Sequence, residues 1–171
     1  QPSLAGSWGK LVPKPTDGDV YRVEVRFISS ETQYRAPSKT PWPELDSFEN
    51  AVVDGPATSQ YAQIDDQGRY KVKFKFDEGS LRDGKATTWL RMAQPHGGSV
   101  EGFHLPLRKG TEVICAYLAG DPDRPVIIGV VPNAVTPSTV TSANNTQNVI
   151  QTGSKNWIVA EDKKDNEWIS I

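Results

Sequence analysis

The chain has 171 residues, of which 36% are hydrophobic, below the share of about 45–50% usual in globular domains. With 19 basic and 21 acidic residues its formal net charge is −2, which argues against a nucleic-acid binder that relies on a basic face. The single cysteine, Cys115, excludes an intrachain disulfide framework, and its apolar neighbours predict a buried, inert thiol.

Residues 1–46 are rich in proline and are expected to hold one strand. Tyr21, Val23, Val25 and Phe27 alternate with charged residues, which is the period of two of a half-buried strand. The later run 36–43 contains three prolines, which favour extended geometry and cannot donate ladder hydrogen bonds. We therefore expect residues 36–43 to form a linker.

Residues 47–133 hold most of the strand signals. Short apolar or alternating runs occur at 51–53, 70–76, 87–93, 112–118 and 126–131, and turn signals such as 65–68 and 83–84 separate them. No segment shows helical periodicity with caps over three turns. The pattern predicts an all-β domain, a small closed barrel of the OB or SH3 type.

Four basic residues fall on alternate positions of one predicted strand, namely Arg69, Lys71, Lys73 and Lys75. In a strand their side chains share one face. A solvated strand face is the simpler interpretation, and a surface that binds oligonucleotides is the alternative.

Residues 134–171 differ from the rest of the chain. They begin with a run made almost entirely of Ser, Thr, Asn and Gln, followed by short apolar pairs separated by polar turns. These pairs are too few for a core of their own, so the tail is either disordered or shares its apolar residues with other copies. The residues predicted to make chain–chain contacts are Val149, Ile150, Trp157, Ile158, Val159, Trp168 and Ile169. The chain stops in an alternating run at Ile171, and we expect it to be a piece of a longer protein.

Several motifs occur in a fixed order along the chain. They are 66–74 (DQGRYKVKF), 89–95 (WLRMAQP), 110–113 (GTEV), 120–125 (GDPDRP) and 130–134 (VVPNA), followed by 146–150 (TQNVI) and 156–162 (NWIVAED). Together they resemble the signature of VgrG-type spike proteins of type VI secretion, which are related to phage tail spikes. The match covers roughly residues 36–171, and residues 1–31 match less well.

The resemblance implies a fold and an assembly. Residues 1–46 would be the end of a hub domain with its proline-rich linker, 47–133 a five-stranded Greek-key OB barrel, and 134–171 the start of an intertwined triple-stranded β-helix. Three chains would form a needle that stands on a tube of Hcp rings, is capped by a PAAR-type tip protein and carries effector proteins. Such a spike waits in the bacterial cytoplasm, is fired through a target membrane and ends outside the cell or in the target cell.

Other functional residues are not expected. The run Gly120, Asp121, Pro122, Asp123, Arg124 and Pro125 is interpreted as a rigid structural turn. His96 and His104 lack further ligands for a metal, and the paired acids at 65–66 and 161–162 point to opposite strand faces, unlike glycosidase carboxylates. We expect no catalysis, cofactor, metal or nucleic acid. Three alternatives stay open: an OB module for oligonucleotides or oligosaccharides, an enzyme whose catalytic domain lies beyond Ile171, and a spike of a contractile phage or extracellular injection particle.

Overall fold

The computed structural model describes residue 25 and residues 27–171. The chain divides into two units, residues 1–42 and 43–171. The strand predicted at 21–27 lies largely outside the described residues; Val25 and Phe27 belong to no strand and are exposed. Residues 33–48 contain neither helix nor strand. Among the described residues, no helix has the length and apolar character needed to cross a membrane.

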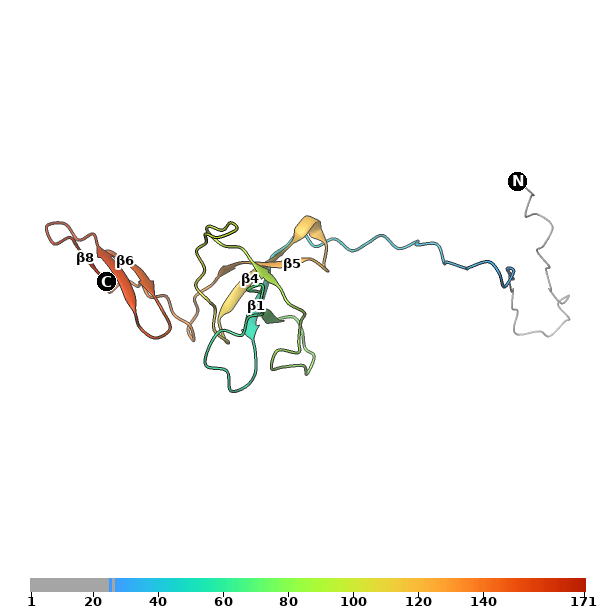
Figure 1. Ribbon diagram of the computed structural model, residues 1–171, viewed down its shortest axis with the longest axis horizontal. Helices are drawn as coiled ribbons and strands as arrows, with labels where there is room; N and C mark the ends of the chain where they lie inside the picture. The colour runs from blue at the N-terminus through green and yellow to red at the C-terminus, as the bar shows by residue number, and fades with distance from the viewer. Residues whose placement is uncertain (1–24, 26) are drawn as a thin grey trace. The chain divides into compact units, whose positions relative to one another are not determined.

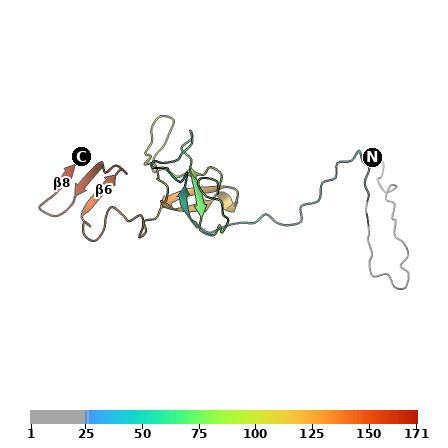
Figure 2. The same ribbon diagram turned by 90° about the horizontal axis from the view of Figure 1, so that it is seen from below.

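The second unit begins with a barrel of five strands. They are β1 (Glu49–Asp54), β2 (Lys71–Phe74), β3 (Arg91–Met92), β4 (Glu112–Tyr117) and β5 (Pro125–Val130), hydrogen-bonded in the order β2-β1-β4-β5-β3. Only the β3–β5 pair in this sheet is parallel. Figure 1 shows β1, β4 and β5 curled together, and Figure 2 shows the same strands from below.

Two residues join the edges of this sheet. Tyr70 and Leu90, which immediately precede β2 and β3, exchange backbone hydrogen bonds of 2.8 and 2.7 Å. The strands therefore follow one another around a ring as β1-β2-β3-β5-β4, which is the order of an OB barrel. The predicted all-β class and OB fold are confirmed, and the SH3 alternative is not.

The core lies inside this barrel. Alternation places Tyr70, Val72 and Phe74 inside, where they pack with residues of the other strands. The other buried core residues are Ala51, Val53, Leu90, Val113, Cys115 and Ile127. The predicted alternation extends one step too far, because β2 ends at Phe74 and Phe76 lies outside the core, 60% exposed and stacked on the Phe74 ring.

The strand predicted at 87–93 is shorter than expected. The Thr87 hydroxyl accepts from the Val72 amide at 3.0 Å and lies 2.9 Å from the Val72 carbonyl oxygen, to which it donates. Because a side chain satisfies both backbone groups of Val72 here, main-chain pairing begins only at Leu90. The strand β3 itself is therefore limited to Arg91 and Met92.

The second part of this unit is a three-stranded antiparallel sheet, here called the tail sheet. It consists of β6 (Gln147–Gln151), β7 (Trp157–Glu161) and β8 (Trp168–Ser170), in that order. The turns between them contain Lys155 and Asp165, whose positive φ angles of 65° and 64° are typical of tight turns. Figure 2 shows β6 and β8 at the two edges of this sheet. The strands expected around residues 149, 158 and 169 are present.

Candidate functional site

The tail sheet carries apolar side chains on both of its faces. Residues paired directly across antiparallel strands point to the same face. The register places Val149 opposite Val159, and Ile150 opposite Ile158. One face therefore holds Val149, Trp157, Val159 and Trp168, and the other holds Ile150, Ile158, Ala160 and Ile169.

Most of these side chains are open to solvent. Trp157 is 52% exposed, Ile158 46% and Ile169 76%. Packed sheet faces normally bury their apolar side chains against a second layer, so exposed apolar residues on both faces indicate surfaces that another molecule covers. All seven residues predicted to make chain–chain contacts lie on these two faces, and that role remains untested.

The face with the two tryptophans is hollowed. A hollow of about 380 Å³ lies over it, lined by Thr139, Asn144, Gln147, Val149, Gln151, Trp157, Val159, Trp168 and Ser170. Seven of these nine residues come from the three strands themselves. The concave surface is thus a property of the sheet face and could receive apolar side chains of a second chain.

A carboxylate closes one end of this face. Glu161 is only 8% exposed and accepts hydrogen bonds from the Gln147 side chain at 3.2 Å and from the Lys163 amide at 2.9 Å. A side-chain hydrogen bond from Thr146 is the main cause that lowers the pKa of Glu161, and those from Gln147 and Lys163 lower it further. The negative charge of Glu161 is therefore stabilised by hydrogen bonds at the edge of the face that holds the two tryptophans.

The segment between the barrel and the tail sheet consists of side-chain-capped turns. Asn144 accepts from the Thr141 amide at 2.8 Å and donates to the Thr139 carbonyl at 3.1 Å and to the Gln147 side chain at 3.1 Å. Asn133 caps an earlier turn in the same way. In the sequence, disorder was one interpretation of this polar run of Ser, Thr and Asn. In the structure its side chains form local hydrogen bonds with the backbone of the same segment.

Where the chain leaves the barrel, Glu112 and Asn133 meet. The Asn133 side-chain nitrogen donates to Glu112 Oε2 at 2.5 Å, and the Lys75 ammonium pairs with Oε1 of the same carboxylate. Glu112 is 7% exposed, and the hydrogen bond from Lys75 is the main cause that lowers its pKa. Glu112 and Asn133 belong to the motifs at 110–113 and 130–134. The sequence alone did not predict that these two residues, 21 positions apart, are in contact.

The predicted structural turn connects β4 to β5. The Asp121 side chain accepts from the Asp123 amide at 3.0 Å, and the Arg124 amide donates to the Asp121 carbonyl at 2.9 Å. The Gly120 carbonyl accepts from the Leu45 amide at 2.8 Å, so the turn also holds the chain that enters β1. Gly120 has a φ of 70°, which glycine adopts without strain. The backbone thus forms a turn here, and its purely structural role stays a prediction.

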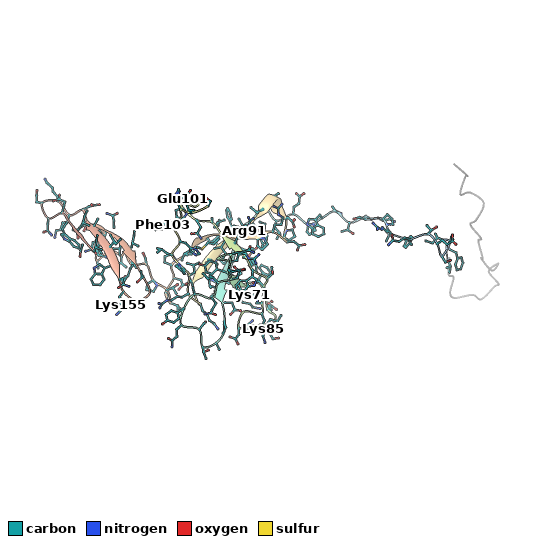
Figure 3. The ribbon with its side chains drawn as sticks, viewed as in Figure 1. Lys71, Lys85, Arg91, Glu101, Phe103 and Lys155 are labelled. Atoms are coloured by element: carbon teal, nitrogen blue, oxygen red, sulfur yellow. The ribbon has the colours of Figure 1, made fainter. Side chains whose placement is uncertain are left out.

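The four alternating basic residues are held by partners within the barrel. Arg69 forms an ion pair with Asp65 at 2.7 Å, Lys73 pairs with Asp77, and Lys75 pairs with Glu112. Lys71 donates to the Gly84 carbonyl at 2.7 Å, and its ammonium lies 5.0 Å from the centroid of the Trp89 ring. Figure 3 shows Lys71 and Arg91 on the barrel and Lys155 on the tail sheet. A row of cations engaged in this way is poorly suited to neutralise phosphates.

A second hollow, of about 200 Å³, lies on the barrel and is lined by Arg69, Thr88, Trp89, Arg91, Leu118, Asp123, Arg124, Pro125 and Val126. Its charge is mixed, because Asp123 stands in the same lining and Arg69 is held by Asp65. The hollow therefore does not present a purely basic surface to an anionic ligand.

The histidines and the cysteine were not expected to bind a metal. His104 Nε2 lies 2.7 Å from the Tyr70 hydroxyl, and Cys115 is fully buried in the core. Burial raises the pKa of the Cys115 thiol to about 11. Within the part of the chain that the structure describes, no group of three or more His, Cys, Asp or Glu residues could hold a metal ion.

Comparison with known proteins identifies the barrel. Residues 60–131 match the family described as the type VI secretion system/phage-baseplate injector OB domain. The spike protein VgrG1a of Pseudomonas aeruginosa is 34% identical over 163 residues, and VgrG4b of the same organism is 33% identical over 155 residues. These matches cover 90% and 85% of this chain, respectively. The resemblance to VgrG-type spike proteins is thereby confirmed.

The chain spans only part of these relatives. It covers 25% of VgrG1a and 19% of VgrG4b. A protein of Vibrio cholerae named actin cross-linking toxin VgrG1 is 33% identical over 133 residues, and the chain covers 12% of it. The shared region is therefore a segment common to relatives whose remaining parts differ in size.

Proposed function

We propose that this chain, which carries the injector OB domain of the VgrG-type spike family, is a structural part of the puncturing spike of a type VI secretion machine. In this role it would pierce target envelopes and carry effectors. The relatives are named as spike proteins of type VI secretion, which supports the machine and the structural role. Piercing and carriage are the steps that go beyond those names.

The observation that supports the proposal best is the apolar surface on both faces of the tail sheet. Three strands from one chain leave Ile158 on one face and Trp157 on the other open to solvent. Three copies that wind about one axis would cover both faces at once, and they would also protect the sheet edges from unwanted pairing. The contacts would be made by Val149, Ile150, Trp157, Ile158, Val159, Trp168 and Ile169.

This assembly assigns a role to each part of the chain. Residues 1–46 would be the end of the hub domain and its linker, and residues 47–133 the OB barrel. Residues 134–171 would begin a triple-stranded β-helix that continues as the needle. The turn at 120–125 would keep the entry to β1 and the β4–β5 connection in a fixed arrangement.

The partners follow from the position of a spike in such a machine. A tube of Hcp rings would carry the homotrimer, a PAAR-type protein would form its tip, and effectors would be attached to it. The spike would be assembled in the bacterial cytoplasm and then secreted, crossing the target membrane once. No cofactor is needed, because this role involves force transmission and no chemical step.

A role in catalysis or in nucleic-acid binding is supported less well. The basic residues on and beside β2 are engaged in ion pairs and in a contact with Trp89, which removes the only feature that favoured an oligonucleotide surface. The toxin name belongs to a relative of which this chain covers 12%, so it says nothing of this segment itself.

The proposal can be tested in a bacterium whose active type VI machine uses the full-length protein. Ile158→Asp would place a charge on the tail sheet, whereas Val100→Asp changes a residue of the β3–β4 loop that is 95% exposed. We expect I158D to abolish release of the Hcp tube protein into the medium and V100D to leave it unchanged. Normal release with I158D, at normal protein level, would contradict the proposal.

A further inference from the structure

Where the chain leaves the barrel, one carboxylate on β4 accepts hydrogen bonds from side chains on β1, just after β2 and at the exit itself. Glu112 on β4 accepts from Lys75 just after β2, from the Asn50 side chain on β1 at 3.3 Å, and from Asn133 at 2.5 Å. The two carboxylate oxygens divide this work, because Lys75 and Asn50 bind Oε1 while Asn133 binds Oε2. One oxygen thus faces the barrel wall and the other faces the exit.

Asn133 continues the connection into the segment beyond the barrel. Its side-chain oxygen accepts from the amides of Val135 and Thr136, both at 2.8 Å, and from the Thr136 hydroxyl at 3.1 Å. The backbone amide of Asn133 donates to the Thr136 carbonyl at 3.0 Å. Because the side-chain oxygen of Asn133 accepts from three donors, the side-chain amide group cannot turn over. Its nitrogen therefore points at Glu112.

We propose that Glu112 and Asn133 form an exit clamp: two positioning residues that fix where and in which direction each chain leaves the barrel, so that three tails start in register. The inference rests on the proposed function for its purpose, whereas the clamp itself rests on the hydrogen bonds above. Hydrogen bonds to a charged, mostly buried carboxylate are stronger than neutral ones. Thirteen residues, 134–146, lie between Asn133 and the start of β6 at Gln147, and an unclamped segment of that length would allow many relative positions.

The arrangement of the two oxygens allows the hydrogen bond to be reversed. Asn133→Asp keeps the acceptor for Val135 and Thr136 but replaces the donor with an oxygen that faces the Glu112 carboxylate. Glu112→Gln keeps an acceptor for Lys75 and Asn50 but places a donor against the Asn133 amide nitrogen. In the double variant E112Q/N133D the glutamine nitrogen donates to the new carboxylate, so the clamp is restored with its polarity exchanged.

The test compares cleavage by proteinase K within residues 134–146, mapped by mass spectrometry, in the 171-residue chain and its variants. We expect N133D and E112Q each to speed cleavage about tenfold or more, the factor that corresponds to loss of a charge-assisted hydrogen bond. The double variant should return to within about twofold of the unsubstituted chain. Lys73→Met is the control, because it removes a barrel ion pair, that with Asp77, which involves neither Glu112 nor Asn133, and it should leave cleavage at 134–146 unchanged.

The outcomes decide the inference without deciding the proposed function. Equal cleavage in all variants, a double variant no slower than the single ones, or K73M as fast as N133D would each overturn the clamp. If a single variant fails to fold, a folded and protected double variant still supports the clamp, since only the reversed bond would rescue it. The solution mass is measured on the same samples: a monomer with the cleavage pattern described above would keep the clamp and contradict the trimer.

Discussion

The Tyr70 hydroxyl lies 2.7 Å from Nε2 of His104 and connects the core of the barrel to its longest loop. The same oxygen accepts from the Leu107 amide at 3.1 Å. The Tyr70 side chain is fully buried, so its polar end needs these two partners. The hydroxyl therefore fixes the loop between β3 and β4 to Tyr70, the residue whose backbone pairs with Leu90 and closes the barrel.

The first prediction concerns this hydroxyl. Tyr70→Phe leaves the ring in place but deprives the Leu107 amide of its acceptor, which should reduce the free energy of unfolding by about 1–2 kcal/mol. Urea unfolding followed by tryptophan fluorescence measures the change. Tyr61→Phe is the matched control, because Tyr61 is 69% exposed and its hydroxyl should contribute little. Equal stability of Y70F and Y61F would contradict this account.

The second prediction concerns acid. The hydrogen bond and charge of Lys75 and the hydrogen bond from Asn133 hold the pKa of Glu112 below its ordinary value of 4.5. A carboxyl group whose pKa is lower in the folded state stabilises the fold above its unfolded pKa, and this contribution is lost as the pH falls through the folded value. The urea concentration at the midpoint of unfolding should therefore be constant above about pH 5 and fall below about pH 4.5.

Glu112→Gln provides the comparison for acid unfolding. The glutamine cannot titrate, so the variant should be less stable at pH 7 and should lose less stability than the unsubstituted chain on acidification. Other carboxyl groups such as Asp77, whose pKa is lowered chiefly by its hydrogen bond with Lys73, leave some acid dependence in both. Parallel pH profiles for the two chains would show that the Glu112 interactions do not contribute.

The third prediction concerns the thiol. Cys115 lies in the core and its pKa is raised to about 11, so at pH 8 only about one thiol in a thousand is ionised even where reagent has access. A disulfide reagent such as DTNB should therefore label the native chain only at the rate at which the barrel opens. Full labelling within seconds in denaturant and within hours without it is the expected result. Rapid labelling of the native chain would contradict the burial of Cys115.

The fourth prediction concerns association. A charge at Ile158 or at Trp157 would have to be buried between chains, which is costly when no partner is present. I158D and Trp157→Asp should each raise the concentration needed for trimer formation by about a hundredfold or more, and V100D should not. Sedimentation velocity over a concentration series measures this shift. If only one variant shifts it, the face that carries the other residue is not covered in the assembly.

The sequence predicted the barrel well because its strands alternate clearly. The alternation of Val72 and Phe74 with lysines predicted β2. The apolar residues within the motifs at 110–113 and 130–134 predicted parts of β4 and β5. The pattern failed where side chains replace main-chain pairing, as at Thr87, and where a strand ends while the alternation continues, as at Phe76. Neither event changes the hydrophobic period: Thr87 bonds Val72 across 15 positions, and β2 ends in a turn in which the Asp77 amide donates to the Phe74 carbonyl.

The candidate site could be predicted only in part. The apolar pairs around Ile150, Ile158 and Ile169 were visible in the sequence, and their separation by polar turns indicated strands. The division of these residues between two faces required the register of the tail sheet. The contact between Glu112 and Asn133 required the register of the β4–β5 pair, since local sequence cannot show which of many polar residues meet across 21 positions.

The central claim, that tails of three chains cover one another, is tested most directly by the solution mass of this chain. Light scattering coupled to size-exclusion chromatography should be run over a hundredfold range of concentration, with I158D alongside. We expect a constant mass of three times 18.8 kDa for the unsubstituted chain and a lower mass for the variant. A mass of 18.8 kDa at every concentration, with the barrel folded and the tail open to protease, would contradict the claim.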